Sequence, residues 1–583
     1  MIKTLAAYIK EYKKASIITP VFMILEVIFE TLIPFLMASI IDDGVEAGNM
    51  RHIYLVGACM IAVAFSGLFC GVMGGKFGAR ASTGFARNLR QAMFDNIQTF
   101  SFASLDKFST AGLVTRLTTD VTNMQMAYQM MLRMCFRAPV SMICAMAMAF
   151  MINAELASVY LAAVVLLGIV LVFIIRGAMK YFQEAFPKYD ELNASVQENV
   201  GAIRVVKAYV REDYETKKLK KASQGIYDIF MKAEKQVVLN MPVMQFTVYS
   251  CILLLSWLGA KQIVHNTLTT GELMSLLAYC MNILMSLMML SMVFVMMSMS
   301  IASARRICEV LEEKSDLTNP AKPLYEVADG GIEFQHVRFA YHKDSDEAVL
   351  HDIDIQILPG ETIGIIGGTG SAKTSLVNLI SRLYDVTEGA VLVGGRDVRE
   401  YDLETLRNQV AVVLQKNVLF SGTILENLRW GNAEATLEEC KRVCRLACAD
   451  EFIEKMPEGY DTYIEQGGSN VSGGQKQRLC IARALLKKPK VLILDDSTSA
   501  VDTATDGKIR KAFAQEIPDT TKIIIAQRIS SVQNADRIIV MEDGYINGVG
   551  THEELLAGNE IYREVYESQT SGGGDFDEKA GEA

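Results

Sequence analysis

The fold of this chain is decided by the stretch Gly367-Gly368-Thr369-Gly370-Ser371-Ala372-Lys373-Thr374-Ser375. An apolar run precedes it at 362–366 and predicts a buried strand, and an apolar-periodic segment follows at 375–380 and predicts a helix. A loop of small residues between a strand and a helix directs backbone N–H groups and the positive end of the helix at an anion. The stretch therefore predicts a phosphate-binding loop, in which Lys373 reaches the outer phosphates of a nucleotide and Thr374 binds Mg²⁺.

One position departs from the pattern G-x-x-x-x-G-K-[ST], because Ala372 stands where a second glycine is expected. A methyl group costs little there if the backbone has helical dihedral angles. It strains the loop if the backbone needs a positive φ. We expect helical dihedral angles at Ala372, because every other part of the pattern is present.

The composition indicates a membrane protein with more than one domain. The chain has 583 residues, of which 51% are hydrophobic, and its mean hydropathy is +0.22, so we expect one part to lie in a bilayer. The formal net charge of −10 argues against a nucleic-acid partner for the chain as a whole. The 11 cysteines are scattered along the sequence, which favours reduced, packed thiols over a disulfide framework.

The N-terminal half contains apolar stretches that are each long enough to cross a bilayer core, for which a helix needs about 20 residues. The six stretches are 16–41, 53–75, 135–153, 156–178, 241–264 and 272–299. Short connections join the first to the second, the third to the fourth and the fifth to the sixth, whereas long polar segments separate the other neighbours. We expect an all-α membrane domain, 15–303, with long helical extensions, preceded by an amphipathic interfacial helix, 1–14.

Lysine and arginine are concentrated in the two long polar segments, and the short connections carry few of them. Because basic loops stay on the cytoplasmic side, we expect a multi-pass protein of the cell membrane with both termini inside. Two parts of the long segments, 105–112 and 201–209, combine turns with aromatic and basic residues. Each is either a surface that docks on another domain or a solvated loop tip.

Glu26 and Glu30 lie one helical turn apart within the first apolar stretch. A carboxylate inside a membrane is a candidate functional group. The two side chains could face a cavity, where they would attract a cationic substrate or take a proton, or they could pair with a base such as Arg137. The sequence leaves both alternatives open.

The second half of the chain begins after a change in composition. Residues 304–330 are less hydrophobic and contain Asn319-Pro320 and Lys322-Pro323, so we expect a linker there. An α/β nucleotide-binding domain is expected over 331–567, because short apolar strands alternate with helical segments. The tail, 568–583, is rich in glycine and acidic residues and is expected to be disordered.

Further motifs in this domain suit the chemistry of a nucleotide and its metal ion. A strand at 491–494 ends in Asp495-Asp496, whose carboxylates suit Mg²⁺. Strands at 410–414 and 522–526 end in Gln415 and Gln527. The stretch Ser472-Gly473-Gly474-Gln475 is a second small-residue helix start that is fit for phosphate, and Tyr341 is an aromatic residue that could stack on adenine.

Taken together, these motifs resemble those of the ATP-binding cassette (ABC) exporters, and the resemblance covers nearly everything before the tail. It implies a half-transporter that pairs with a second one, with each ATP held between the Walker motifs of one chain and the signature motif of the other. By resemblance, Tyr341 stacks on adenine, Gln415 is the Q-loop residue that reaches Mg²⁺, and Asp502 closes the D-loop. Ser472, Gly473, Gly474 and Gln475 form the signature, and 105–112 and 201–209 look like coupling helices.

Two positions depart from the family's pattern of catalytic residues. Asp496 stands where the family has a glutamate as general base, and Gln527 stands where it has a histidine. The shorter carboxylate lies further from the attacking water, and an amide cannot pass on a proton. The chain is therefore expected to bind Mg-ATP and hydrolyse it slowly, although an aspartate that still works as the base is the alternative.

This asymmetry predicts a different partner chain whose competent site is completed by the signature motif of this one, as in heterodimeric bacterial multidrug exporters. The expected substrate is amphipathic or hydrophobic. A peptide or lipid exporter, a homodimeric exporter, and a regulatory, ATP-gated membrane module remain alternatives.

Overall fold

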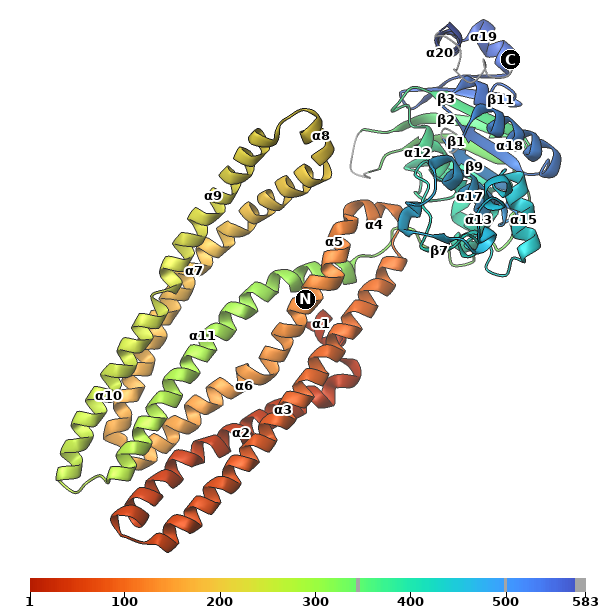
Figure 1. Ribbon diagram of the computed structural model, residues 1–583. Coiled ribbons are helices and arrows are strands. Elements are labelled where there is room, and N and C mark those ends of the chain that lie inside the picture. Colours follow the sequence, from red (N-terminus) through yellow and green to blue (C-terminus); the bar gives the residue numbers. More distant parts are fainter. Residues whose placement is uncertain (342–346, 497–500, 572–583) are drawn as a thin grey trace. The chain divides into compact units, whose positions relative to one another are not determined.

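The computed structural model describes residues 1–341, 347–496 and 501–571. The chain divides into two compact units (Figure 1). Unit 1 consists of Met1–Gln98 and Ser109–Glu313, and unit 2 consists of Thr99–Phe108 and Lys314–Ala583. A short piece of the N-terminal half thus belongs to the same unit as the phosphate-binding loop. Most of the expected tail, 572–583, lies outside the described residues.

Unit 1 is built from helices. They are α1 (Ile2–Ala7), α2 (Lys13–Ser39), α3 (Met50–Gln98), α5 (Thr110–Thr115), α6 (Val121–Ile152), α7 (Ala154–Gly201), α8 (Ile203–Ala208), α9 (Glu212–Val237), α10 (Asn240–Val264) and α11 (Thr270–Glu312), with short 3₁₀ or π turns at Lys10–Tyr12, Ile40–Glu46 and Arg116–Asp120. Among the described residues, six helical segments are long and apolar enough to cross a membrane, as the sequence predicts.

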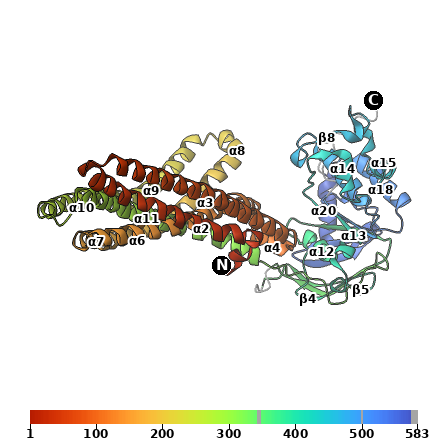
Figure 2. The same cartoon turned by 90° about the horizontal axis from the view of Figure 1, so that it is seen from below.

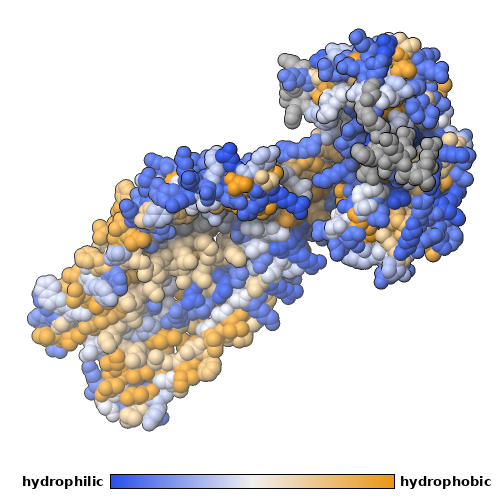
Figure 3. Space-filling model, turned by 45° about the horizontal axis from the view of Figure 1, so that its top comes forward, coloured by the Kyte–Doolittle hydropathy of each residue, from blue (hydrophilic) through white to orange (hydrophobic). Residues whose placement is uncertain are grey.

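The connections in unit 1 follow the expected pattern of short turns and long extensions. Only Asn153 separates α6 from α7, and its side chain accepts a hydrogen bond from the backbone N–H of Leu156 and so caps α7. Helix α11 begins with a reciprocal capping box between Thr269 and Glu272. The long helices run side by side in Figure 1, and Figure 3 shows hydrophobic side chains gathered over one end of the helical bundle. That band suits burial in lipid.

Unit 2 contains a six-stranded sheet in the order β12-β11-β3-β10-β9-β6. The strands are β3 (Thr362–Gly367), β6 (Val410–Val413), β9 (Val491–Asp495), β10 (Thr521–Ile525), β11 (Arg537–Glu542) and β12 (Tyr545–Gly550). All neighbours pair in parallel except the edge strand β12. Every residue of β9 and β10 is buried, which explains the apolar runs at 491–494 and 523–525 within them.

Two smaller sheets complete the strands of unit 2. An antiparallel sheet in the order β2-β1-β4-β5 contains β1 (Ile332–Phe339), β2 (Leu350–Ile357), β4 (Glu388–Val393) and β5 (Arg396–Asp397), and a two-stranded sheet pairs β7 (Gly422–Thr423) with β8 (Tyr463–Ile464). In Figure 2, β4 and β5 lie at the opposite end of unit 2 from β8.

The helices of unit 2 surround these sheets. They are α4 (Phe102–Lys107), α12 (Lys373–Ile380), α13 (Leu403–Gln409), α14 (Ile424–Arg429), α15 (Leu437–Leu446), α16 (Asp450–Ile453), α17 (Gly473–Leu485), α18 (Thr503–Glu516), α19 (His552–Gly558) and α20 (Glu560–Ser571). Three buried cysteines of unit 2, Cys440, Cys444 and Cys448, pack in its hydrophobic core, so they behave as apolar side chains.

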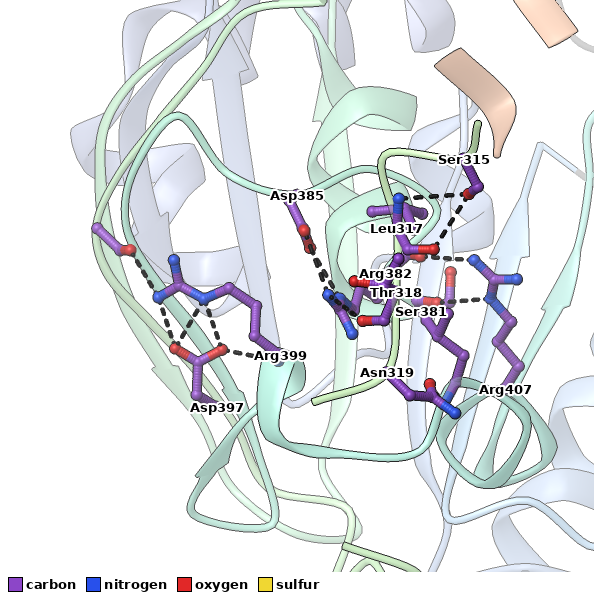
Figure 4. A network of polar contacts seen from close by, with 12 residues as sticks. Ser315, Leu317, Thr318, Asn319, Ser381, Arg382, Asp385, Asp397, Arg399 and Arg407 are labelled. Carbon is purple, nitrogen blue, oxygen red and sulfur yellow. Dashed lines mark hydrogen bonds and ion pairs between the residues drawn. The ribbon is translucent and has the colours of Figure 1, made fainter. Parts of the chain in front are cut away.

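The segment that enters unit 2 after α11 is fastened to the strand–helix core by polar contacts (Figure 4). Because α11 extends to Glu312, the first part of the expected linker, 304–330, is helical. The buried Arg382 guanidinium donates to the carbonyl oxygen of Thr318 at 3.3 Å and to Asp385 at 2.8 Å. The side-chain amide of Asn319 donates to Asp402 at 2.6 Å. The linker is thus held two residues beyond the end of α12.

Candidate nucleotide-binding site

A cavity of about 520 Å³ opens at the carboxyl ends of the parallel strands in unit 2. This is the edge at which open α/β sheets bind their ligands. Nearly all the residues expected to bind nucleotide and metal from one chain meet there. The predicted residues that line the cavity are Gly367, Gly368, Thr369, Gly370, Ala372, Lys373, Thr374, Ser375, Gln415, Asp495, Asp496 and Gln527.

The loop between β3 and α12 is braced by its own side chains. The ammonium group of Lys373 donates to the carbonyl oxygens of Gly367 at 2.9 Å and Gly368 at 2.7 Å. The hydroxyl of Ser371, which does not line the cavity, donates to the carbonyl oxygen of Gly368 at 2.9 Å. Burial lowers the pKa of Lys373, and the carboxylates of Asp495 and Asp496 oppose that shift. The negative charge of a bound polyphosphate would likewise favour the charged form of Lys373.

The expectation for Ala372 is wrong. Its φ is +67° and its ψ is 21°, in the left-handed region, where it precedes the first residue of α12. The loop must turn sharply here to bring its N–H groups round to the start of the helix, and only glycine makes that turn without a steric penalty. The methyl group costs about 1–2 kcal/mol at such a position. The loop keeps its shape despite this strain.

Oxygen donors suited to Mg²⁺ meet at one side of the cavity. The Thr374 hydroxyl donates to the two carboxylate oxygens of Asp495 at 3.0 and 3.2 Å, and Gln415 lines the same cavity. Burial raises the pKa of Asp495, while the hydrogen bond from Thr374 lowers it. A hydroxyl, a carboxylate and an amide oxygen are hard donors, and Mg²⁺ is commonly held by one or two such groups together with substrate phosphates. The residues present fit that ion.

Asp496 and Gln527 contact each other directly. The amide Nε2 of Gln527 donates to Oδ2 of Asp496 at 2.7 Å, and both residues line the cavity. The backbone of Asp496 has a φ of +47°, and its N–H donates to the carbonyl oxygen of Ile525 at 3.0 Å. The Asp496 carboxylate is thus held toward a neutral amide from the next strand.

Tyr341 does not line this cavity. Its hydroxyl lies 2.8 Å from the hydroxyl of Ser375 in α12, and its ring packs edge-on against Phe339 and Tyr384, with centroid distances of 4.9 and 5.1 Å. The next residues, 342–346, lie outside the described part of the chain. The structure thus places Tyr341 beside the phosphate loop, in contact with its helix.

The expected signature and D-loop residues lie away from the cavity of their own chain. Ser472 caps α17 and forms a reciprocal capping box with Gln475, and Gly473 and Gly474 form the first turn. Asp502 caps α18, because its carboxylate accepts a hydrogen bond from the N–H of Thr505 at 2.9 Å, and this bond lowers the pKa of Asp502. Two helix N-termini are therefore formed and capped outside the cavity.

Sequence reasoning missed the part played by Tyr384. Its hydroxyl donates to the carboxylate of Asp106 in α4 at 2.7 Å, and its ring meets Phe102 edge-on at 6.0 Å. Burial and the neighbouring Asp106 raise the pKa of Tyr384, which keeps the donating hydroxyl protonated. The only signal in the sequence was an aromatic residue shortly after the phosphate-loop helix. Helix α4 therefore packs on the rest of unit 2, the unit to which it belongs. Its last residues fall within the segment 105–112.

Comparison with known proteins agrees with this geometry. Residues 16–288 match the family described as ABC transporter transmembrane region, and residues 350–499 match the family described as ABC transporter. An uncharacterized ABC transporter ATP-binding protein of Bacillus subtilis is 36% identical over 563 residues, which are 97% of this chain and 98% of that protein. An ATP-dependent lipid A-core flippase of Desulfotalea psychrophila is 32% identical over 491 residues, 84% of this chain and 85% of that protein.

Among solved structures, a bacterial Atm1-family ABC exporter with ATP bound superposes with a TM-score of 0.83. It is 23% identical in sequence, and the match covers 96% of this chain and 99% of that one. This likeness concerns the fold: a membrane domain of six apolar helices followed by a nucleotide-binding domain.

Proposed function

The chain belongs to the ABC transporter family, as a multi-pass membrane protein with an ATP-binding domain, and from this premise we propose that it is one subunit of an exporter that pairs with a different half-transporter. In this proposal its own site binds Mg-ATP and hydrolyses it slowly. Its signature motif completes a faster site on the partner. The exported compounds are amphipathic or hydrophobic.

The contact between Gln527 and Asp496 is the observation that carries this proposal. A general base must lie within about 2.6–3.2 Å of the proton that it removes. Here the carboxylate of Asp496, one methylene shorter than a glutamate, accepts a hydrogen bond from Gln527 at 2.7 Å. The amide has no second protonation state in the physiological range, so it cannot relay a proton.

The rest of the site supports tight binding without fast turnover. Lys373, Thr374, Asp495 and Gln415 line one cavity and offer a cation and oxygen donors to Mg-ATP. Loss of a positioned acid–base group slows a reaction by roughly 10²–10⁴-fold. Asp496 and Gln527 act as one unit, so their two effects should not be multiplied.

The need for a partner follows from the position of the signature residues. Ser472 and Gln475 form a capped helix start outside the cavity of their own chain. Such a helix start suits a phosphate that is supplied by another chain. A second copy of this chain would give two slow sites, whereas a different subunit with a glutamate and a histidine at the matching positions would give one fast site.

Lipid export is a second candidate function. Two relatives that are described as ATP-dependent lipid A-core flippases, from Desulfotalea psychrophila and Hahella chejuensis, are 32% and 29% identical to this chain. These likenesses favour a lipid-like amphiphile over a peptide as the exported compound.

The test is the behaviour of the full chain purified without companions into lipid nanodiscs. We expect the chain to bind ATP and to release most of it intact, because the rate of hydrolysis is far lower than the rate of ATP release. Brisk turnover that is abolished by Asp496→Asn would contradict the proposal and favour a homodimeric exporter. Transport by the native complex that persists after Lys373→Ala, with altered regulation, would favour an ATP-gated regulatory module.

A further inference from the structure

A second cavity, of about 420 Å³, lies within unit 1 between α2, α3 and α6. Four charged side chains line it. They are Glu26 and Glu30 from α2 and Arg133 and Arg137 from α6. Two apolar residues of α3, Leu68 and Val72, line it as well. All three helices belong to membrane-spanning segments, where charged groups mark functional sites.

One guanidinium group takes up both carboxylates. Nη1 of Arg137 lies 2.5 Å from Oε1 of Glu26, and Nη2 lies 2.8 Å from Oε2 of Glu30. Of the two alternatives left open by the sequence, the structure therefore favours pairing with Arg137. One oxygen of each carboxylate contacts that arginine, while Oε2 of Glu26 is buried without a hydrogen-bond partner. The pairing with Arg137 argues against a role of the two carboxylates in attracting a cationic substrate.

Arg133 lies one helical turn from Arg137 and is left over. Across the described residues it has no hydrogen-bond or ion-pair partner, and its Nε is buried without one. Its stem packs beside α3, since a Cβ added at Gly78 would lie 3.4 Å from the Arg133 Cδ. The glycine lets α3 approach closely enough to hold the side chain at the cavity.

An unpaired cation is an unstable arrangement in apolar surroundings. Buried charges in proteins are paired, because an uncompensated charge loses its hydration without gaining a partner. The four charges sum to zero, and Oε2 of Glu26 is buried without a partner, yet among the described residues no carboxylate oxygen lies within ion-pair distance of Arg133. The missing partner is therefore an anion that is not part of the described chain.

The apolar wall of the cavity indicates what carries this anion. Leu68 is 61% exposed and Val72 is 60% exposed, next to the charged groups. Arg133 precedes the apolar stretch expected at 135–153, so this arginine lies near the edge of the apolar layer. A molecule with an acidic head and an apolar chain matches both walls, whereas a free inorganic ion matches only one.

We propose that this cavity binds the phosphate or carboxylate head of a lipid-like amphiphile, with Arg133 as its anchor and the apolar chain along Leu68 and Val72. The inference rests on the proposed function and names the substrate class: an acidic amphiphile. Basic pockets between membrane helices bind lipid head groups in this way. The ion pairs of Arg137 with Glu26 and Glu30 hold α6 against α2 and limit the net positive charge near the head group.

The test measures lipid binding in the full chain, held in phosphatidylcholine nanodiscs, with a fluorescent phosphatidic acid as the probe. Arg133→Gln should weaken binding by at least about tenfold, the effect of losing a charged hydrogen-bonding partner. Arg133→Lys should retain part of the affinity. Arg87→Gln, which removes an exposed arginine from α3, is the matched control and should leave binding unchanged.

Glu30→Gln gives the decisive sign, because it removes a negative charge from the same cavity. It should strengthen probe binding, whereas a variant that merely damaged the helix packing would weaken it. Unchanged binding in Arg133→Gln, or weakened binding in Glu30→Gln, would overturn the inference. Displacement of the probe by inorganic phosphate as readily as by unlabelled phosphatidic acid would overturn the assignment to a lipid head group.

Failure here is distinguishable from failure of the proposed function. The binding assay requires no ATP turnover and no partner chain, and ATP binding to each variant reports that unit 2 is intact. Brisk ATPase activity of the isolated chain would refute the slow site and leave the lipid-binding result standing. Absence of probe binding would refute the substrate class alone.

Discussion

The side-chain amide of Gln527 and the carboxylate of Asp496 are joined by a hydrogen bond of 2.7 Å at the edge of the nucleotide cavity. The two residues follow neighbouring parallel strands, β10 and β9, so the pairing is set by the register of the sheet. A charged base and a neutral amide thus occupy the place where proton transfer is expected. Each residue can be changed separately to the type that the family pattern has at its position.

We expect the double substitution Asp496→Glu with Gln527→His to raise ATP hydrolysis by the isolated chain about 10²-fold or more, since it returns a longer base and a titratable neighbour. Steady-state phosphate release measures it. Gln527→His alone should do less. If the double variant hydrolyses ATP no faster than the native chain while binding it equally well, the slow step lies elsewhere.

The strain at Ala372 predicts a stabilising substitution. Ala372→Gly should raise the free energy of unfolding of unit 2 by up to about 1 kcal/mol, because glycine adopts a φ of +67° without steric strain. The strain that is relieved outweighs the extra conformational entropy that glycine gives to the unfolded chain. Denaturant unfolding followed by Trp430 in a Trp257→Phe background checks it. The matched control, Ala514→Gly in the exposed face of α18, should lower stability by about 1 kcal/mol.

The raised pKa of Asp495 predicts how Mg²⁺-dependent binding changes with pH. Burial moves the pKa above its ordinary value of 3.8, and only the ionised carboxylate binds the metal. Mg²⁺-assisted ATP affinity should therefore be lost, as pH falls, at a higher pH than an ordinary aspartate would give. The contribution of Asp495 to the free energy of unfolding changes in the opposite sense. It decreases as pH rises from 3.8 through the folded-state pKa, because the folded chain binds the proton more tightly than the unfolded chain does.

Calorimetric titration of ATP with and without Mg²⁺ across the acidic range separates the two effects. Asp495→Asn should bind ATP with little dependence on Mg²⁺ at any of these pH values. A metal dependence in that variant equal to that of the native chain would show that other groups hold the ion.

The hydrogen bond between Tyr384 and Asp106 predicts a link between α4 and the nucleotide domain. Tyr384→Phe and Asp106→Asn should each loosen α4 and speed amide hydrogen exchange over 102–107, with a coupling of about 1 kcal/mol between them. ATP binding should change little. Tyr325→Phe, at a tyrosine that is 72% exposed, is the control. Additive effects of the two substitutions would show that the bond contributes nothing.

Much of the fold follows from the sequence because its signals are local and strong. The apolar stretches gave six membrane helices, and short apolar runs gave buried parallel strands such as β9 and β10. The convergence of Gly367, Asp495 and Gln527 also follows from sequence, since the carboxyl ends of parallel strands share one edge.

The missed features depend on geometry that no local pattern encodes. The dihedral angles of Ala372 are imposed by the path of the loop, so the presence of the other motif residues was a poor guide to the conformation of the one residue that departs from it. The pairing of Glu26 and Glu30 with Arg137 was one of two alternatives that the sequence left open, because it joins residues more than 100 positions apart and depends on how two helices are rotated. The contact of Tyr384 with Asp106 spans 278 positions.

The placement of Thr99–Phe108 in the same compact unit as Lys314–Ala583 has a consequence for biosynthesis. During translation α4 leaves the ribosome long before the strands that it packs on, and it must wait while more than 200 further residues are made. A fragment that starts at Lys314 would leave the Tyr384 ring without the Phe102 ring that covers it. We expect such a fragment to expose an apolar patch and to be bound by chaperones. Addition of a peptide of residues 99–108 should cover this patch and reduce chaperone binding.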